Sequence, residues 1–120
     1  MDSVAPMDVA TRAFLERHVE TFNGAVSSGD FAPLVALFAP DGHLEFVGVP
    51  VGPFVGREAI AAAYAAQPPT DTMTILDTRV GTDGTVVEGF SWSADHGRQS
   101  GEMRMVLADG QIRRLVVSFT

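Results

Sequence analysis

The chain has 120 residues and a formal net charge of −7, with 15 acidic against 8 basic residues. A nucleic acid or an anionic membrane surface would require a basic patch, and the basic residues here are spread along the sequence, so we expect neither partner. The sequence has no Cys, which excludes disulfides and thiolate chemistry, and its three His are too scattered to suggest a metal site.

The start of the chain carries acidic residues and lacks the apolar core of a signal peptide, and no run approaches the roughly 18 apolar residues of a membrane-spanning helix. We therefore expect a cytoplasmic protein.

Asp8 is suited to cap a first helix over residues 9–27, and Gly29 is suited to end it, because glycine readily adopts the left-handed conformation that follows a helix. Apolar residues recur at helical spacing in this segment and comprise Phe14, Leu15, Val19, Phe22 and Val26.

Asp30 is suited to cap a second, short helix. Pro33 is compatible with this helix because it falls in the first turn, where the missing N–H would have no partner. Residues 43–47 alternate between apolar and polar side chains, which predicts a strand. The loop over residues 48–56 is unusually apolar for a surface segment. A third helix is predicted over residues 57–67, directly before two prolines.

The rest of the sequence predicts strands joined by tight turns. Asp-Gly pairs at residues 83–84 and 109–110 indicate hairpins, and His96-Gly97 marks the turn between them. This order predicts a single α+β domain over residues 1–120, in which three N-terminal helices pack on a curved mixed or antiparallel sheet around a cone-shaped pocket, as in a cystatin-like α+β roll. The four strands are expected near residues 73–80, 85–94, 98–107 and 111–119.

Strand alternation makes Glu88 the first candidate for acid–base chemistry. It shares a strand face with Phe90 and Trp92, and this face should look into the pocket beside Met103 or Met105. A carboxyl among apolar side chains is desolvated, which raises its pKa toward the range of a general base. The alternatives are a structural ion pair with an arginine and a position at the open rim.

His18 lies on the apolar stripe of the first helix, where it could hydrogen-bond a ligand or relay a proton. The alternative is a half-buried histidine bonded to a backbone carbonyl.

No phosphate-binding loop or dinucleotide motif occurs in the sequence, so we expect no cofactor. The side chains expected to line the pocket are Phe14, Phe22, Phe46, Phe90, Trp92, Met103, Met105, Leu115, Val117 and Phe119.

Three stretches resemble the nuclear transport factor 2-like superfamily, which includes ketosteroid isomerases and SnoaL-like polyketide cyclases. They are residues 28–46 (SGDFAPLVALFAPDGHLEF), residues 56–60 (GREAI) followed by Tyr64, and residues 110–115 (GQIRRL). The resemblance spans nearly the whole chain and implies the same α+β fold. It is weak for function, because this scaffold hosts several kinds of enzyme as well as proteins without activity.

The resemblance also implies which polar groups a ketosteroid isomerase would have here. Counting from the shared motifs, the position of the general-base Asp is Phe46, that of the oxyanion-binding Tyr is Phe22, and that of the second Asp is about Met103. All three are apolar, so the usual isomerase mechanism is not expected. Tyr64 matches a supporting Tyr on the third helix, whose hydroxyl would point toward the pocket floor.

These features support a first hypothesis of a cofactor-independent isomerase, cyclase or hydrolase acting on an apolar small molecule of, for example, the polycyclic or terpenoid class. Glu88 would be the base and His18 or Tyr64 the polarising donor. The alternatives are a binding protein for an apolar ligand without chemistry, and an interaction module. A homodimer through the outer sheet face, as in relatives, is compatible with each.

Overall fold

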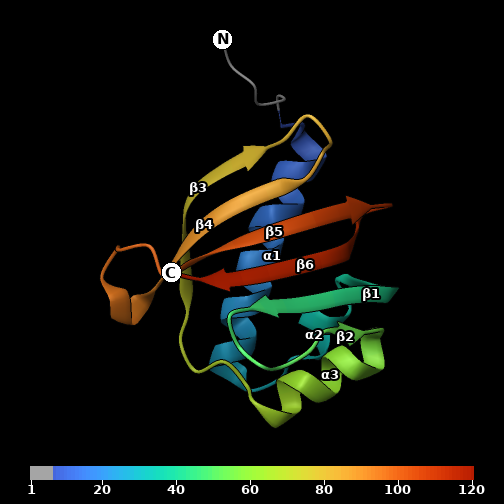
Figure 1. Cartoon of the computed structure of the whole chain (residues 1–120), viewed down its shortest axis with the longest axis vertical. Helices are drawn as coiled ribbons and strands as arrows, with labels where there is room; N and C mark the ends of the chain where they lie inside the picture. Colours follow the sequence, from blue (N-terminus) through green and yellow to red (C-terminus); the bar gives the residue numbers. More distant parts are fainter. Residues whose placement is uncertain (1–6) are drawn as a thin grey trace.

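The long first helix follows from its two capping residues. The structure, a computed structural model, describes residues 7–120, and in it α1 (Val9–Ser28) begins where the Asp8 carboxylate accepts a hydrogen bond from the Thr11 backbone N–H at 2.7 Å. Gly29 ends α1 in the left-handed conformation, with φ of 80°. One side of α1 packs against the concave face of a curved sheet (Figure 1), and the core of the protein lies between them.

Two shorter helices, α2 (Ala32–Val35) and α3 (Arg57–Ala66), lie at one end of the sheet (Figure 1). The Asp30 carboxylate accepts a hydrogen bond from the Ala32 backbone N–H at 3.1 Å, but the N-cap residue of α2 is Phe31, one position after the predicted cap Asp30. The Arg57 side chain donates from Nε to the backbone carbonyl of Phe38 at 2.8 Å. This bond ties the start of α3 to the sheet.

The sheet is mixed and has six strands among the described residues, in the order β2-β1-β6-β5-β4-β3, with β1 parallel to β6 and every other pair antiparallel. The α+β fold with three helices and a curved, unclosed sheet is as predicted. The bounds are β1 (Phe38–Val47), β2 (Phe54–Val55), β3 (Met73–Val80), β4 (Val86–Trp92), β5 (Gly101–Ala108) and β6 (Gln111–Phe119).

The boundaries differ from the prediction at several places, among them the start of β5 at Gly101, three residues later than expected. Three further differences involve distant partners. β1 begins at Phe38, five residues earlier than expected, because the parallel partner β6 continues its pairing. The short β2 lies inside the predicted loop and pairs with β1. Residues 93–95 form a 3₁₀ turn rather than the end of a strand. Each of these three differences comes from a partner that is distant in the sequence.

The strand faces follow the predicted alternation with one correction. A register shift between Val106 and Leu107 in the β5–β6 pair turns Arg113 outward, where it contacts Asp41 at 3.6 Å. Strict alternation along residues 111–119 would place Arg113 on the inward face with Leu115, and the shift prevents this. The shift is a β-bulge, which strict period-two alternation does not anticipate.

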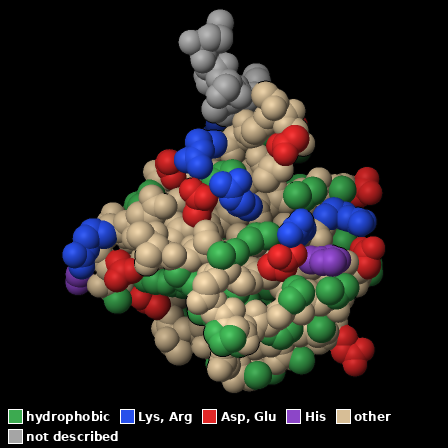
Figure 2. All heavy atoms as spheres, viewed as in Figure 1, with side chains coloured by type: hydrophobic (Ala, Val, Ile, Leu, Met, Phe, Trp, Pro, Cys, Tyr) green, Lys and Arg blue, Asp and Glu red, His purple; other side chains and the backbone are tan. Residues whose placement is uncertain are grey.

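The outer face of the sheet carries interleaved acidic and arginine side chains, seen in Figure 2. Arg79 and Arg104 each contact Glu102 at 3.4 Å, and Arg79 also contacts Asp77 at 3.5 Å. Among the helices of residues 7–120, none combines the length and the apolar character that crossing a bilayer requires.

Two glycines give opposite predictions for stability. A Cβ at Gly101 in β5 would overlap the backbone carbonyl of Ser118 and lie 2.9 Å from the Phe90 ring, whereas a Cβ at Gly24 in α1 meets nothing within 4 Å. Gly101→Ala should lower the free energy of unfolding by about 2 kcal/mol, because the backbone must shift. Gly24→Ala should raise it by about 0.5–1 kcal/mol, because alanine favours a helix. Urea unfolding measures both, and a stable Gly101→Ala variant would contradict the close packing of β5 on β6.

Candidate functional site

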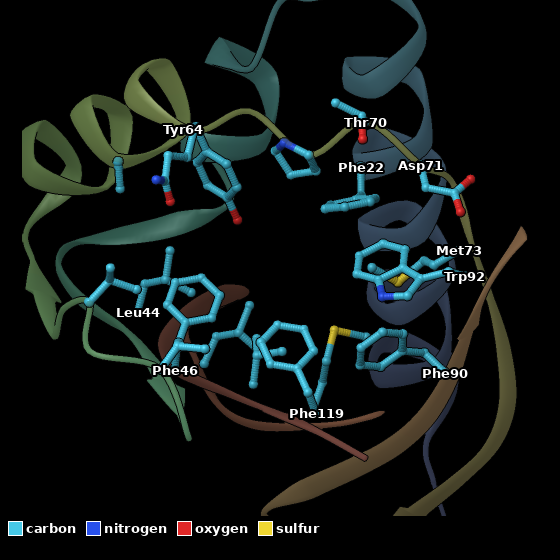
Figure 3. Close-up of a pocket in the computed structure, with 18 of the residues that line it drawn as sticks. Phe22, Leu44, Phe46, Tyr64, Thr70, Asp71, Met73, Phe90, Trp92 and Phe119 are labelled. Atoms are coloured by element: carbon cyan, nitrogen blue, oxygen red, sulfur yellow. The ribbon is translucent and has the colours of Figure 1, made fainter. Parts of the chain in front are cut away.

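A cavity of about 970 Å³ lies between the concave face of the sheet, α1 and α3 (Figure 3). Its wall is mostly apolar, and the loop before β2 and the segment before β3 complete it. The lining residues are His18, Phe22, Leu44, Phe46, Val49, Val51, Phe54, Ala59, Ala62, Ala63, Tyr64, Ala66, Gln67, Pro69, Thr70, Asp71, Met73, Phe90, Trp92, Ala94, Asp95, Met103, Leu115, Val117 and Phe119.

Aromatic rings form two parts of the wall. Phe46 from β1 and Phe119 from β6 are stacked, with ring centroids 6.3 Å apart and an interplanar angle of 3°. The ring of Trp92 meets that of Phe90 edge to face, with centroids 5.1 Å apart. It lies tilted against the ring of Phe22 of α1, with centroids 6.0 Å apart. Flat apolar ligands suit such surfaces, because stacked and edge-to-face contacts stabilise aromatic groups beyond the burial of their area.

Tyr64 supplies a hydroxyl to this apolar wall. Its ring is buried and stacks on Phe31 with centroids 5.3 Å apart and an interplanar angle of 7°, which fixes the orientation of the side chain. Figure 3 shows the hydroxyl pointing into the cavity, across from Trp92. Burial raises the pKa of Tyr64, so the hydroxyl stays protonated and can donate a hydrogen bond.

His18 lines the cavity from the middle of α1. Its side chain is 1% exposed, and burial lowers its pKa to about 4, so the imidazole is neutral at pH 7. The buried Nδ1 atom has no hydrogen-bond partner. The alternative of a half-buried histidine held by a backbone carbonyl through this nitrogen therefore does not apply.

Glu88 lies on the inward face of β4 as predicted but is not among the residues that line the cavity. Its side chain is 2% exposed, Thr78 donates to its Oε2 at 3.4 Å, and its Oε1 has no partner. Burial raises its pKa to about 7. Glu88 does not form an ion pair with Arg104 or Arg113, because these contact Glu102 and Asp41 instead. It does not lie at the open rim, because its side chain is buried.

Two of the ten side chains predicted to line the pocket do not do so. Phe14 and Met105 are buried in the core cluster instead. They have the predicted inward orientation but lie toward the other end of the sheet, where Met105 is paired with Val86 and Leu115. The core fills that end with side chains and leaves no cavity there. The other eight predicted residues line the cavity.

The three positions that the resemblance assigns to ketosteroid isomerase chemistry, Phe22, Phe46 and Met103, all line the cavity, as does Tyr64. The count along the sequence therefore led to residues of the cavity wall. At those three positions the wall is apolar, and among the residues that line the cavity the buried polar groups are the Tyr64 hydroxyl and the His18 imidazole.

Several lining residues were missed by the sequence analysis. Val49, Val51 and Phe54 come from the loop whose apolar composition was noted without a role. Asp71 and Asp95 also line the cavity, Asp95 from the position directly before the predicted His96-Gly97 turn. No group of three metal-ligating side chains occurs within residues 7–120.

A family model described as the SnoaL-like domain matches residues 15–115. No curated protein matches the sequence. Among solved structures, a candidate ketosteroid isomerase from Kribbella flavida matches with a TM-score of 0.69 and 17% identity, over 92% of this chain and 78% of that chain.

Two further structures show the same fold. A candidate polyketide cyclase from Sinorhizobium meliloti gives a TM-score of 0.61 and 22% identity, over 87% of this chain and 97% of that chain. An NTF2-like protein of unknown function from Mesorhizobium loti gives a TM-score of 0.64 and 20% identity, over 99% of each chain. At these identities the likeness is one of fold.

Proposed function

Because the chain belongs to the SnoaL-like domain family, we propose that it encloses an apolar small molecule in its cavity and transforms it by acid–base chemistry, as an isomerase, cyclase or hydrolase that needs no cofactor. The observation that carries this proposal is an apolar cavity of about 970 Å³ into which one oriented hydroxyl, that of Tyr64, points. A few placed polar groups in an apolar wall are typical of sites that bind and orient small molecules.

Tyr64 and His18 divide the chemistry in this proposal. The Tyr64 hydroxyl donates a hydrogen bond to a carbonyl, epoxide or hydroxyl oxygen of the substrate, where negative charge develops. The neutral His18 imidazole accepts the proton that leaves the substrate. In an isomerisation the same proton returns to another atom of the substrate, so no other reactant is consumed.

Glu88, the sequence analysis's first choice as base, has no direct contact with the substrate in this proposal. It lies outside the set of residues that line the cavity. Its raised pKa follows from burial alone and does not bring it within hydrogen-bond reach of a ligand. We therefore expect Glu88→Gln to change stability more than turnover.

A binding protein without chemistry is the second candidate. The apolar side chains at Phe22, Phe46 and Met103 favour it, since they leave the cavity short of reacting groups. The low pKa of His18, about 4, favours it as well, because such an imidazole is a weak base. Turnover of any bound compound would rule this candidate out.

Blocking the cavity should abolish ligand binding. We expect a hit from a panel of steroids, terpenoids, their epoxides and aromatic polyketides to change the fluorescence of Trp92, the only Trp and a cavity residue. Ala63→Phe should remove the response, because Ala63 lines the cavity. Ala65→Phe is the matched control, since Ala65 lies on the same helix and does not line it.

The same titrations identify the ligand class and lead to the assay for turnover. A ligand at about 100 times its dissociation constant should also stabilise the protein by about 2.7 kcal/mol against unfolding. Equal responses in the Ala63→Phe and Ala65→Phe variants would place binding outside the cavity and contradict the proposal. Product formed from a bound compound, followed by chromatography, separates the enzyme from the binding protein.

A further inference from the structure

The charged groups that line the cavity are all of one sign. Among the described lining residues there is no Lys or Arg, and two carboxylates are present, Asp71 and Asp95. Both side chains are partly exposed, so they lie where the cavity meets solvent. His18, the one further titratable base in the wall, is neutral at pH 7 because burial lowers its pKa to about 4.

Hydrogen bonds hold both carboxylates beside Trp92. Asp71 accepts hydrogen bonds from the Ser93 hydroxyl and, at 3.0 Å, from the Ala94 backbone N–H, and these bonds lower its pKa, so it stays ionised. Asp95 accepts from the Ser100 hydroxyl. Figure 3 shows Asp71 and Trp92 on the same side of the cavity. The negative charge is thus fixed at one side of the cavity.

The interior offers no compensation for an anion. The Tyr64 hydroxyl is a single neutral donor, and the remaining wall is mostly apolar. An unpaired charge moved from water into such surroundings carries a large desolvation cost. An anionic ligand would meet this cost in addition to repulsion from Asp71 and Asp95, whereas an uncharged ligand meets neither.

We propose that the cavity selects uncharged apolar ligands and rejects anionic ones, with Asp71 and Asp95 as the residues that determine this specificity. The inference rests on the proposed function, since it assumes that the cavity binds a ligand. It names the substrate class as an uncharged apolar molecule with an oxygen that accepts a hydrogen bond from Tyr64. Carboxylic acids and sulfonates of the same size are excluded.

Three fluorescent probes that share one ring system test this proposal. N-phenyl-1-naphthylamine is uncharged, 8-anilinonaphthalene-1-sulfonate adds one negative charge, and the corresponding sulfonamide adds similar bulk without the charge. Dissociation constants are measured by titration at low ionic strength, where charge effects are screened least. We expect the sulfonate to bind at least about tenfold more weakly than the sulfonamide, because of desolvation and repulsion.

The variant Asp71→Asn/Asp95→Asn should reduce the ratio between the dissociation constants of the sulfonate and the sulfonamide, called the affinity gap below. Asparagine keeps one acceptor oxygen at each position. At residue 71 this oxygen can accept from the Ala94 backbone N–H while the amide NH₂ donates to the Ser93 hydroxyl, and at residue 95 it can accept from the Ser100 hydroxyl, so the turn beside Trp92 is preserved. The matched control is Asp83→Asn/Asp109→Asn, which changes the net charge equally at two hairpin residues that do not line the cavity. We expect this control to leave the gap unchanged.

The outcomes separate the two proposals. Equal affinity for sulfonate and sulfonamide would overturn the charge selection while leaving the cavity as a binding site. An affinity gap between sulfonate and sulfonamide that narrows equally in both double variants would show that Asp71 and Asp95 do not determine the charge selection. Failure of all three probes to bind, with no change in Trp92 fluorescence, would overturn the proposed function and the inference together.

Discussion

Replacing Glu88 with Gln should make the free energy of unfolding rise with pH between about pH 4 and 6.5, whereas replacing His18 with Leu should make it fall between about pH 4.5 and 7. The two side chains are each at least 98% buried, and each has one polar atom without a partner. Their pKa values are shifted by burial in opposite directions, so their effects on stability oppose one another.

Glu88 stabilises the folded state only while it is protonated. Its pKa rises from 4.5 to about 7 on folding, so between these values the folded chain holds a proton that the unfolded chain has released. Stability that is present below pH 4.5 is therefore lost as the pH rises and is gone above about pH 7. The full loss amounts to about 3 kcal/mol.

His18 acts in the other direction. Its pKa falls from 6.5 to about 4 on folding, so between these values the unfolded chain binds a proton that the folded chain does not. Stability present above pH 6.5 is lost as the pH falls toward 4, again by about 3 kcal/mol in full. In the wild type the contributions of Glu88 and His18 to the slope of the unfolding free energy against pH largely cancel between pH 4.5 and 6.5. In each variant only the contribution of the residue that remains is left.

Urea unfolding at pH 4 to 8.5 measures these profiles. Subtracting the wild-type curve leaves only the contribution of the replaced residue with its sign reversed, so the difference for Glu88→Gln should rise between pH 4.5 and about 7, and the difference for His18→Leu should fall between about pH 4 and 6.5. The exposed Glu16 provides the control, since Glu16→Gln should give a curve parallel to the wild type. A difference between Glu88→Gln and wild type that stays constant with pH would show that the carboxyl is not desolvated. The same result for His18→Leu would show that the imidazole titrates as in water.

Tyr64→Phe should lower kcat by about 100-fold for the substrate that the binding screen identifies, since an oriented donor to developing negative charge contributes about this much. The substitution removes one oxygen and keeps the ring that stacks on Phe31. Folding should therefore be preserved. KM should change less than kcat, because the hydrogen bond strengthens in the transition state.

A second variant separates hydrogen-bond donation from ring packing. Phe31→Leu removes the ring that orients Tyr64 but keeps the hydroxyl itself. We expect it to lower the free energy of unfolding and to lower kcat by less than Tyr64→Phe does, because a donor is still present. Steady-state kinetics and thermal unfolding of both variants provide the comparison. An unchanged kcat in Tyr64→Phe would remove Tyr64 from the chemistry, and a loss confined to binding would support the second candidate function.

The sequence by itself determined the elements and the direction in which most side chains point. The caps Asp8 and Gly29 placed α1 to within one residue, and alternation placed Glu88 and Phe90 on the inward face of β4. These features depend on backbone conformation and on neighbours a few residues away, which the local pattern of side chains encodes.

Tertiary structure alone decided how far the cavity extends. Phe14 and Met105 point inward as expected, yet core packing fills their end of the sheet. Asp95 is brought to the cavity by a turn and by a bond from Ser100. Alternation reports which face of a strand is buried, whereas the boundary between a filled core and an open cavity depends on where distant helices and loops cover that face. Such coverage is set by contacts between residues far apart in the chain, and no local pattern encodes it.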